Sequence, residues 1–229
     1  MSKLYIHQPD FLPSLNFFLR SKVSDNFVIL DDVQFNRRGW TNRDLIKTQN
    51  GSQKITIPVK YMPRNLSLIK NIKISYETNW VNEISDKIEK NYNKSKFYEN
   101  NFNLIHKELD KKHEKLIDLN VCLIKKIFKI FNIRTKIFFS SNLNITSKKS
   151  DKILEICKKM NCREYITGSG SKTYLDLAKF KKNKIKINFD INFNKKYEQI
   201  NGNFVENLSV IDYLFNCYNG SSSSNILND

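Results

Sequence analysis

The chain has 229 residues, of which 40% are hydrophobic and 27% are charged. This length and this balance predict a folded protein of one domain and exclude an intrinsically disordered chain. No stretch approaches 18 consecutive apolar residues, which excludes a transmembrane helix, and the first residues lack the apolar stretch of a secretory leader. We therefore expect a cytoplasmic protein without a membrane span.

The charge of the chain is strongly basic, with 39 Lys and Arg residues against 23 Asp and Glu, a formal net charge of +16. Such an excess often indicates nucleic acid, phosphate-bearing ligands or a membrane surface. Most of it is lysine that alternates with apolar residues, which is typical of solvated faces. Because no nucleic-acid recognition motif accompanies the charge, a nucleic-acid partner is not expected.

The first third of the chain predicts a strand, a helix and a second strand over residues 3–32. The helix is expected over 11–22, with Asp10 as its N-cap. The continuous apolar run at 27–30 is typical of a parallel strand that is buried on both faces. Edge or antiparallel strands are expected next, at 55–59 and 69–74.

The middle of the chain predicts three amphipathic helices, because apolar residues recur there at helical spacing. They are expected to begin near residues 80, 97 and 116. In the last third, strands and helices alternate, which predicts parallel crossover units. The elements expected there are strands at 136–139, 164–167 and 185–191 and helices at 150–160 and 173–180.

These patterns together predict an α/β fold with a parallel or mixed sheet, built from βαβ units at both ends of the chain with a helical insertion in the middle. A single domain is expected over residues 1–219, with the helical segment 79–132 as a candidate subdomain. The serine-rich residues 220–229 are expected to form a flexible tail.

The cysteines and two of the three histidines carry no recognisable ligand pattern. The four cysteines, Cys122, Cys157, Cys162 and Cys217, stand in no metal-binding spacing, so they are expected to be small buried apolar residues and no metal site is predicted. His106 and His113 belong to a lysine-rich helical stretch and are expected at the surface.

Chemically distinctive residues follow three of the expected strands. His7 and Gln8 end the first strand, with Gln8 as a substrate-binding candidate. Asp31 and Asp32 end the second strand, and a glycine-rich turn follows the strand at 164–167. Ligands of parallel sheets bind beyond the carboxyl ends of the strands. His7 beside a carboxylate predicts a general base whose tautomer one of the two acids fixes, although a structural hydrogen bond from His7 to the backbone is an equal alternative.

The glycine-rich turn predicts an anion site made by backbone N–H groups at the start of a helix. It is not a Walker A loop, because Ser171 precedes the lysine, and it lacks the third glycine of the dinucleotide fingerprint. A simple tight turn is the alternative. The substrate-binding candidates of this turn are Gly168, Ser169, Gly170, Lys172 and Tyr174.

The segment 32–43 gathers planar hydrogen-bond donors and an aromatic residue in one loop. Arginine forks suit phosphate or carboxylate, and amide and indole side chains suit sugars. A structural loop or binding of single-stranded nucleic acid are the alternatives. The substrate-binding candidates here are Gln34, Arg37, Arg38, Trp40, Asn42 and Arg43.

The order of these motifs resembles the WbqC-like family. The resemblance lies in IHQPDFLP at 6–13, FVILDDVQF at 27–35, WTNR at 40–43, YITGSGSKTYLD at 165–176 and LSVIDYLFN at 208–216. Tyr197 with Gln199 also fits, whereas Asp10 stands where asparagine is more usual. The resemblance implies a role in the biosynthesis of O-antigen, lipopolysaccharide or another surface polysaccharide, with a nucleotide-linked sugar as partner.

The favoured hypothesis is a transferase, an acyltransferase or aminoacyl transferase, that acts on a nucleotide-linked amino sugar. His7 would be the general base and Asp31 or Asp32 would orient it. No cofactor is defined by the sequence, although an acyl donor such as acyl-CoA fits the hypothesis. The alternatives are a glycosyltransferase with a divalent metal at the two acids, and a non-catalytic nucleotide-sugar binding module. A second copy of the chain, in a homodimer, is considered as a further partner.

Overall fold

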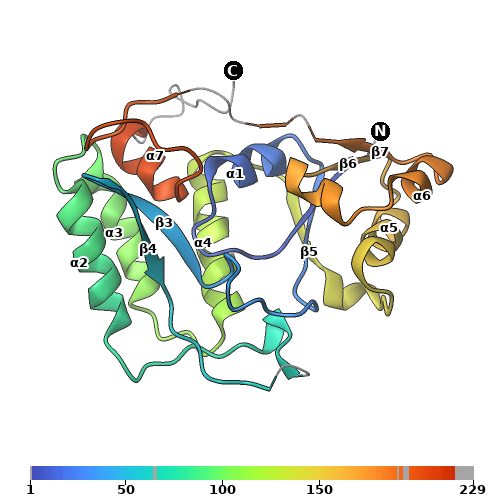
Figure 1. The fold of residues 1–229 in the computed structure, drawn as a ribbon, viewed down its shortest axis with the longest axis horizontal. Coiled ribbons are helices and arrows are strands. Elements are labelled where there is room, and N and C mark those ends of the chain that lie inside the picture. Colours follow the sequence, from blue (N-terminus) through green and yellow to red (C-terminus); the bar gives the residue numbers. More distant parts are fainter. Residues whose placement is uncertain (1, 64–65, 190, 193–195, 220–229) are drawn as a thin grey trace. The chain divides into compact units, whose positions relative to one another are not determined.

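The computed structural model describes residues 2–63, 66–189, 191–192 and 196–219 (Figure 1). The chain forms two compact units whose segments alternate along the sequence. Unit 1 comprises residues 1–8, 16–32 and 133–193, and unit 2 comprises residues 9–15, 33–132 and 194–229. The expected tail at 220–229 lies outside the described residues. Throughout the described ranges, every helix is too short or too polar to cross a membrane.

Unit 1 is built on a five-stranded sheet in which each pair of neighbouring strands is parallel. Its strands are β1 (Lys3–His7), β2 (Asn26–Ile29), β5 (Lys136–Phe139), β6 (Glu164–Ile166) and β7 (Lys186–Asn188), in the order β5-β2-β1-β6-β7. The predicted parallel α/β sheet is therefore confirmed.

The core of unit 1 explains why its central strands read as apolar runs. Leu4 and Val28 are fully buried in the cluster that the sheet forms with α5 (Lys149–Lys159) and α6 (Leu177–Lys182). Cys157 and Cys162 belong to this cluster, so the prediction of buried apolar cysteines is correct for both. Strands covered on both faces need apolar residues at every position rather than at alternate ones.

The helices of unit 1 differ from their predicted bounds at two places. Helix α1 (Leu15–Lys22) begins four residues later than expected, because Leu12 has a left-handed φ of 45° and precedes Pro13, which disfavours helical backbone at the residue before it. Asp10 is therefore not its cap. The helix expected at 173–180 is replaced by a 3-10 turn, η4 (Ser169–Thr173), and by α6, whose N-cap is Asp176.

Unit 2 combines an antiparallel hairpin with four helices. The hairpin pairs β3 (Arg43–Thr48) with β4 (Gly51–Thr56), and Gly51 has a φ of 124° that favours glycine. The helices are α2 (Trp80–Tyr92), α3 (Tyr98–Leu109), α4 (Leu116–Ile130) and α7 (Val210–Cys217). The three helices predicted for the middle of the chain are confirmed.

Several expectations for unit 2 are wrong. The strand expected at 69–74 is instead a 3-10 turn, η2 (Ile69–Asn71), followed by isolated bridges. His106 and His113 are half-buried rather than exposed, because each ring binds a neighbouring side chain, Ser85 and Glu108 respectively. Cys122 and Cys217 are only partly buried.

Candidate functional site

The carboxyl ends of β2, β1 and β6 lie side by side at one edge of the sheet in unit 1, because these three strands are parallel neighbours. The chain runs from β1 outward to β2 and β5, then returns to β6 on the other side of β1 and continues to β7. The switch in direction lies between β1 and β6, which is where sheets of this kind leave a crevice for ligands. The topology thus brings together the three segments that the sequence singles out, around His7, Asp31 and Gly168.

His7 ends β1 at this switch point, and its ring is half-buried. The ring stacks on Tyr5 at 5.6 Å between centroids and meets Phe17 edge-on at 5.4 Å. Its Nδ1 lies 3.0 Å from the carbonyl oxygen of Gln8. A carbonyl can only accept a hydrogen bond, so Nδ1 carries a proton, and in the neutral form of the ring Nε2 is the nitrogen with the lone pair. This tautomer suits a general base.

Asp31 and Asp32 have partners other than the one expected for them. Ser141 donates to Asp31 through its backbone N–H at 2.9 Å and through its hydroxyl at 2.6 Å, and Ser140 donates to both acids. Asp31 thus holds the start of the 3-10 turn η3 (Ser140–Leu143). The carbonyl of Gln8, rather than a carboxylate, is the group seen on Nδ1 of His7.

A buried lysine neutralises Asp32. Lys152, on α5, places its ammonium 2.8 Å from the Asp32 carboxylate, and the two side chains are only 7% and 14% exposed. Burial by itself raises the pKa of Asp32, but the hydrogen bonds from Lys152 and Ser140 outweigh it and hold the pKa below its usual value. A divalent cation on Asp32 would have to displace this ammonium, which argues against the metal-dependent alternative. No sequence pattern pointed to Lys152.

The glycine turn after β6 is a tight 3-10 turn. Gly168 is extended at φ −86° and ψ 158°, and Gly170 has no positive φ, so neither glycine supplies the left-handed backbone of an anion nest. The N–H of Ser171 is bonded to the carbonyl of Gly168 at 3.0 Å. Lys172 lies over the ring of Phe189 at 4.8 Å. This geometry fits the tight-turn alternative better than the backbone anion site. Ser169 and Tyr174 are exposed beside it.

Arg20, on α1, lies against this turn and was not among the sequence candidates. Its Nε donates to the carbonyl of Ile191 at 3.0 Å, and its Nη2 donates to Asn192. A Cβ added to Gly168 would stand 3.1 Å from its Nη1. A Cβ at this position would make a tight contact that moves the guanidinium by a few tenths of an ångström, and Arg20 puts a positive charge next to the end of β6. A single arginine on a helix forms no motif, so Arg20 could not be predicted from the sequence.

Alanine at position 168 is expected to lower the free energy of unfolding by about 1 kcal/mol, since the new Cβ pushes the guanidinium off its two oxygen acceptors. Gly170→Ala is the matched control, because a Cβ there meets nothing within 4 Å. Urea unfolding of both variants, alone and with Arg20→Ala, checks this. If Gly168→Ala lowers the free energy of unfolding equally in the presence and in the absence of the Arg20 side chain, the guanidinium is not the cause.

The candidates from the loop 32–43 lie in unit 2, apart from Asp32. Gln34 and Arg37 line a pocket of about 630 Å³, together with Asn36, Lys60 and Tyr61. Gln34 donates to the carbonyl of Ser67 at 3.1 Å, and the Arg37 guanidinium lies 5.0 Å above the Tyr61 ring. A pocket of this size, with two cations and an aromatic ring, suits a phosphate-bearing ligand of nucleotide dimensions.

The remaining loop candidates are arranged differently. Arg38 and Trp40 are exposed, and Trp40 holds the loop through its carbonyl, which accepts the N–H of Phe11 at 3.1 Å. Asn42 is buried and donates to the carbonyl of Ile57 at 2.9 Å, so it ties the loop to the end of the hairpin. Arg43 donates to the carbonyl of Arg37. Asn42 therefore has a structural role, which the local sequence did not indicate.

Comparison with known proteins confirms the family resemblance that the order of the motifs indicated. The sequence profile of the WbqC-like protein family matches residues 8–223, which is nearly the whole chain. The chain belongs to the WbqC-like protein family. It is similar to the uncharacterized protein Rv1507c of Mycobacterium tuberculosis, with 29% identity over 218 residues that cover 94% of each chain. No solved structure gives a significant match.

The structure explains one of the elements that carry the WbqC-like resemblance. The buried carboxylate of Asp212, in LSVIDYLFN, accepts hydrogen bonds from Tyr92 at 2.9 Å, Tyr197 at 2.7 Å and Gln199 at 2.8 Å. Burial raises the pKa of Asp212 although these donors oppose the shift. The Tyr197 and Gln199 pair of this WbqC-like chain is thus part of a buried polar network that holds α7 in unit 2.

A second buried carboxyl group, Asp44 on β3, was not predicted. Burial raises its pKa to about 8; the N–H of Leu45, 2.6 Å away, opposes the shift, and the charge of nearby Asp10 adds to it. Asp44 is therefore largely protonated at neutral pH. Asp10 is itself buried and accepts from Thr41 at 3.4 Å.

Proposed function

We propose that this WbqC-like chain is a transferase that joins an acyl or aminoacyl group to the amine of a nucleotide-linked amino sugar, in the synthesis of a surface polysaccharide. The observation that carries the proposal is His7, which stands at the switch point of a parallel sheet as the Nδ1–H tautomer. A neutral imidazole with its lone pair on Nε2 can act as the general base that accepts the proton of the attacking amine.

In the proposed step, the amine nitrogen attacks the acyl carbonyl carbon and forms the new C–N bond. The bond from that carbon to the leaving group breaks, and a thiolate departs when the donor is an acyl thioester. His7 takes the proton that the nitrogen loses, and this proton then passes to the leaving group. Direct attack fits better than a covalent intermediate, because Ser171, the buried serine of the glycine turn, uses its hydroxyl on the carbonyl of Gly168.

Within each unit taken by itself, positive side chains are suited to an anionic group. Arg20 lies beside the turn at the carboxyl edge of unit 1, and Arg37 and Lys60 line the pocket of unit 2. Guanidinium groups bind phosphate with paired hydrogen bonds, as a nucleotide diphosphate would require. The proposed cofactor is an acyl donor such as acyl-CoA.

The experiment is a turnover panel with the purified full chain. Nucleotide-linked amino sugars are incubated with acyl-CoA or aminoacyl donors, and products are read by mass spectrometry and by the thiol released. Acylation of an amino sugar, but not of the matched sugar with a hydroxyl in place of the amine, is the expected result. Tight nucleotide-sugar binding without turnover by any donor would favour the binding module. Glycosyl transfer that stops on chelation and returns with Mg²⁺ would favour the glycosyltransferase.

A further inference from the structure

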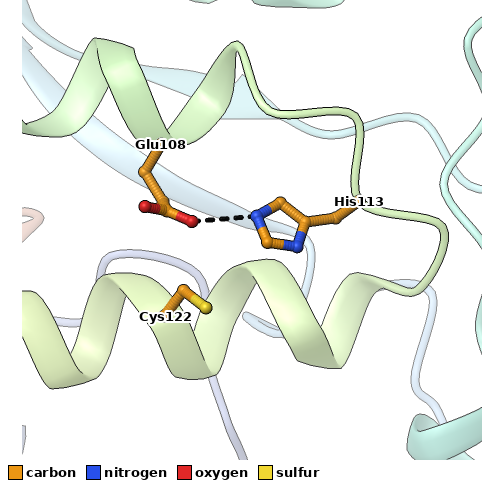
Figure 2. Close-up of side chains that lie close together, drawn as sticks. All are labelled: Glu108, His113 and Cys122. Atoms are coloured by element: carbon orange, nitrogen blue, oxygen red, sulfur yellow. Dashed lines mark hydrogen bonds and ion pairs between the residues drawn. The ribbon is translucent and has the colours of Figure 1, made fainter.

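Three side chains with different donor atoms converge in unit 2, on the pair of helices α3 and α4. Glu108 lies in the last turn of α3, His113 lies in the connection to α4, and Cys122 lies on α4 (Figure 2). One ligand atom from each of the three lies within 4.8 Å of the others. Figure 2 shows all three side chains directed into the space between the helices. Nothing in the proposed transfer uses them.

The fold holds the histidine of this cluster in place. The carbonyl of His113 accepts the hydroxyl of Tyr76 at 3.0 Å, and its N–H donates to the carbonyl of Lys111 at 2.8 Å. Its Nε2 faces the Glu108 carboxylate at 2.9 Å. The imidazole is thus positioned through its backbone as well as its ring.

The carboxylate of Glu108 is 1% exposed and ionised. Its second oxygen lies 3.0 Å from the ammonium of Lys111 and 3.3 Å from that of Lys126. These lysine side chains are 61% and 35% exposed, so their ammonium groups can turn into water at little cost, because ion pairs with exposed partners stabilise a protein weakly. A cation that forms bonds to three ligands can therefore displace them from Glu108.

We propose that Glu108, His113 and Cys122 form a zinc site, with a fourth position open to water. Carboxylate oxygen, imidazole nitrogen and thiolate sulfur together suit the borderline-soft Zn²⁺ better than Mg²⁺ or Ca²⁺, which take oxygen ligands. On binding, the Cys122 thiol gives one proton to solvent, and Nε2 of His113, which faces Glu108, must carry no proton in order to bind the metal. The metal would then fasten the end of α3 to α4.

The spacing of these residues explains why sequence analysis predicted no metal site. Glu108 and His113 are five residues apart and Cys122 follows nine residues later, which matches none of the familiar ligand patterns. The reversal of the chain between α3 and α4 is what brings them together.

The test uses Co²⁺ as a spectroscopic probe in the purified, metal-free full chain. One equivalent of Co²⁺ is expected to give the absorbance of a tetrahedral ion with a cobalt–thiolate charge-transfer band, and Zn²⁺ should displace it. Cys122→Ser should abolish the band. Cys217→Ser should leave it unchanged, because Cys217 is a half-buried thiol in α7 that donates to the carbonyl of Glu198. His113→Asn, which keeps the backbone contacts, should weaken the binding of both metals.

A second variant separates a metal site from an ion-pair network. Replacing Lys111 and Lys126 together by methionine should raise the affinity for Zn²⁺ about ten-fold, the factor that two weak ion pairs represent together. A thiolate band that persists in Cys122→Ser, or an affinity that the lysine substitutions leave unchanged, would show that Glu108 serves only as the counter-ion of the lysines.

Discussion

Replacing His7 by glutamine is expected to lower kcat of the proposed transfer by about 10²–10⁴-fold, the usual contribution of a general base. Glutamine preserves much of the side-chain volume between Tyr5 and Phe17, but it cannot take a proton from the attacking amine. Added imidazole should restore part of the turnover in His7→Ala, where the substitution leaves room for it.

The control for this prediction is His106→Gln. His106 is half-buried on α3 of unit 2, where its Nδ1 lies 3.0 Å from the hydroxyl of Ser85, so its loss tests the general effect of removing a histidine. Turnover should stay within a few-fold of the parent. If His7→Gln also keeps turnover within a few-fold of the parent, and added imidazole does not raise the turnover of His7→Ala, His7 is not the base.

The stability of the protein is expected to fall by about 5 kcal/mol between pH 4 and pH 8 through Asp44 alone. Burial raises the pKa of this carboxyl to about 8 in the folded protein, with Asp10 adding to the shift, whereas an unfolded chain has a pKa of about 3.9. The folded state keeps the proton while the unfolded state releases it. The stabilising contribution of Asp44 is thus complete below pH 4, decreases as the pH rises from 4 to 8, and is lost above pH 8.

Asp44→Asn isolates this contribution. Asparagine keeps an oxygen that can accept the N–H of Leu45 but cannot ionise. The variant should match the parent near pH 4 and exceed it by several kcal/mol at pH 8, as measured by urea unfolding across that range. Asp86→Asn, at an exposed position of α2, is the matched control and should follow the parent at every pH. A constant difference between Asp44→Asn and the parent from pH 4 to 8 would refute the assignment.

Local sequence was sufficient to predict the strands and helices whose buried positions follow a regular pattern of apolar residues. The apolar residues at 4–6 and 27–30 indicated parallel strands because both faces of β1 and β2 are covered, and α2, α3 and α4 followed from helical spacing. Strand β3 was missed because it carries Arg43, Asp44 and Lys47. Two of these, Asp44 and Lys47, are buried by neighbours distant in the chain, which a local pattern does not contain.

The candidate site was predictable to a similar degree. The positions of His7, Asp31 and the glycine turn at strand ends were visible in the sequence, but the strand order that makes β2, β1 and β6 neighbours was not. The partners of the acids were also hidden. Lys152 lies 120 residues from Asp32, and Ser140 and Ser141 lie more than 100 residues from the acids. These hydrogen-bonded pairs depend on the tertiary path of the chain, which a local sequence motif does not specify.

The alternation of the two units along the chain has a consequence for biosynthesis. During translation, β1 and β2 leave the ribosome early, but β6, the second neighbour of β1, follows more than 150 residues later. The edge of the nascent β1 that pairs with β6 therefore stays unpaired until residues 164–166 have been synthesised, a situation that slows folding and favours aggregation. Neither unit can be obtained by shortening the gene from one end, because each unit is assembled from three separate segments of the chain.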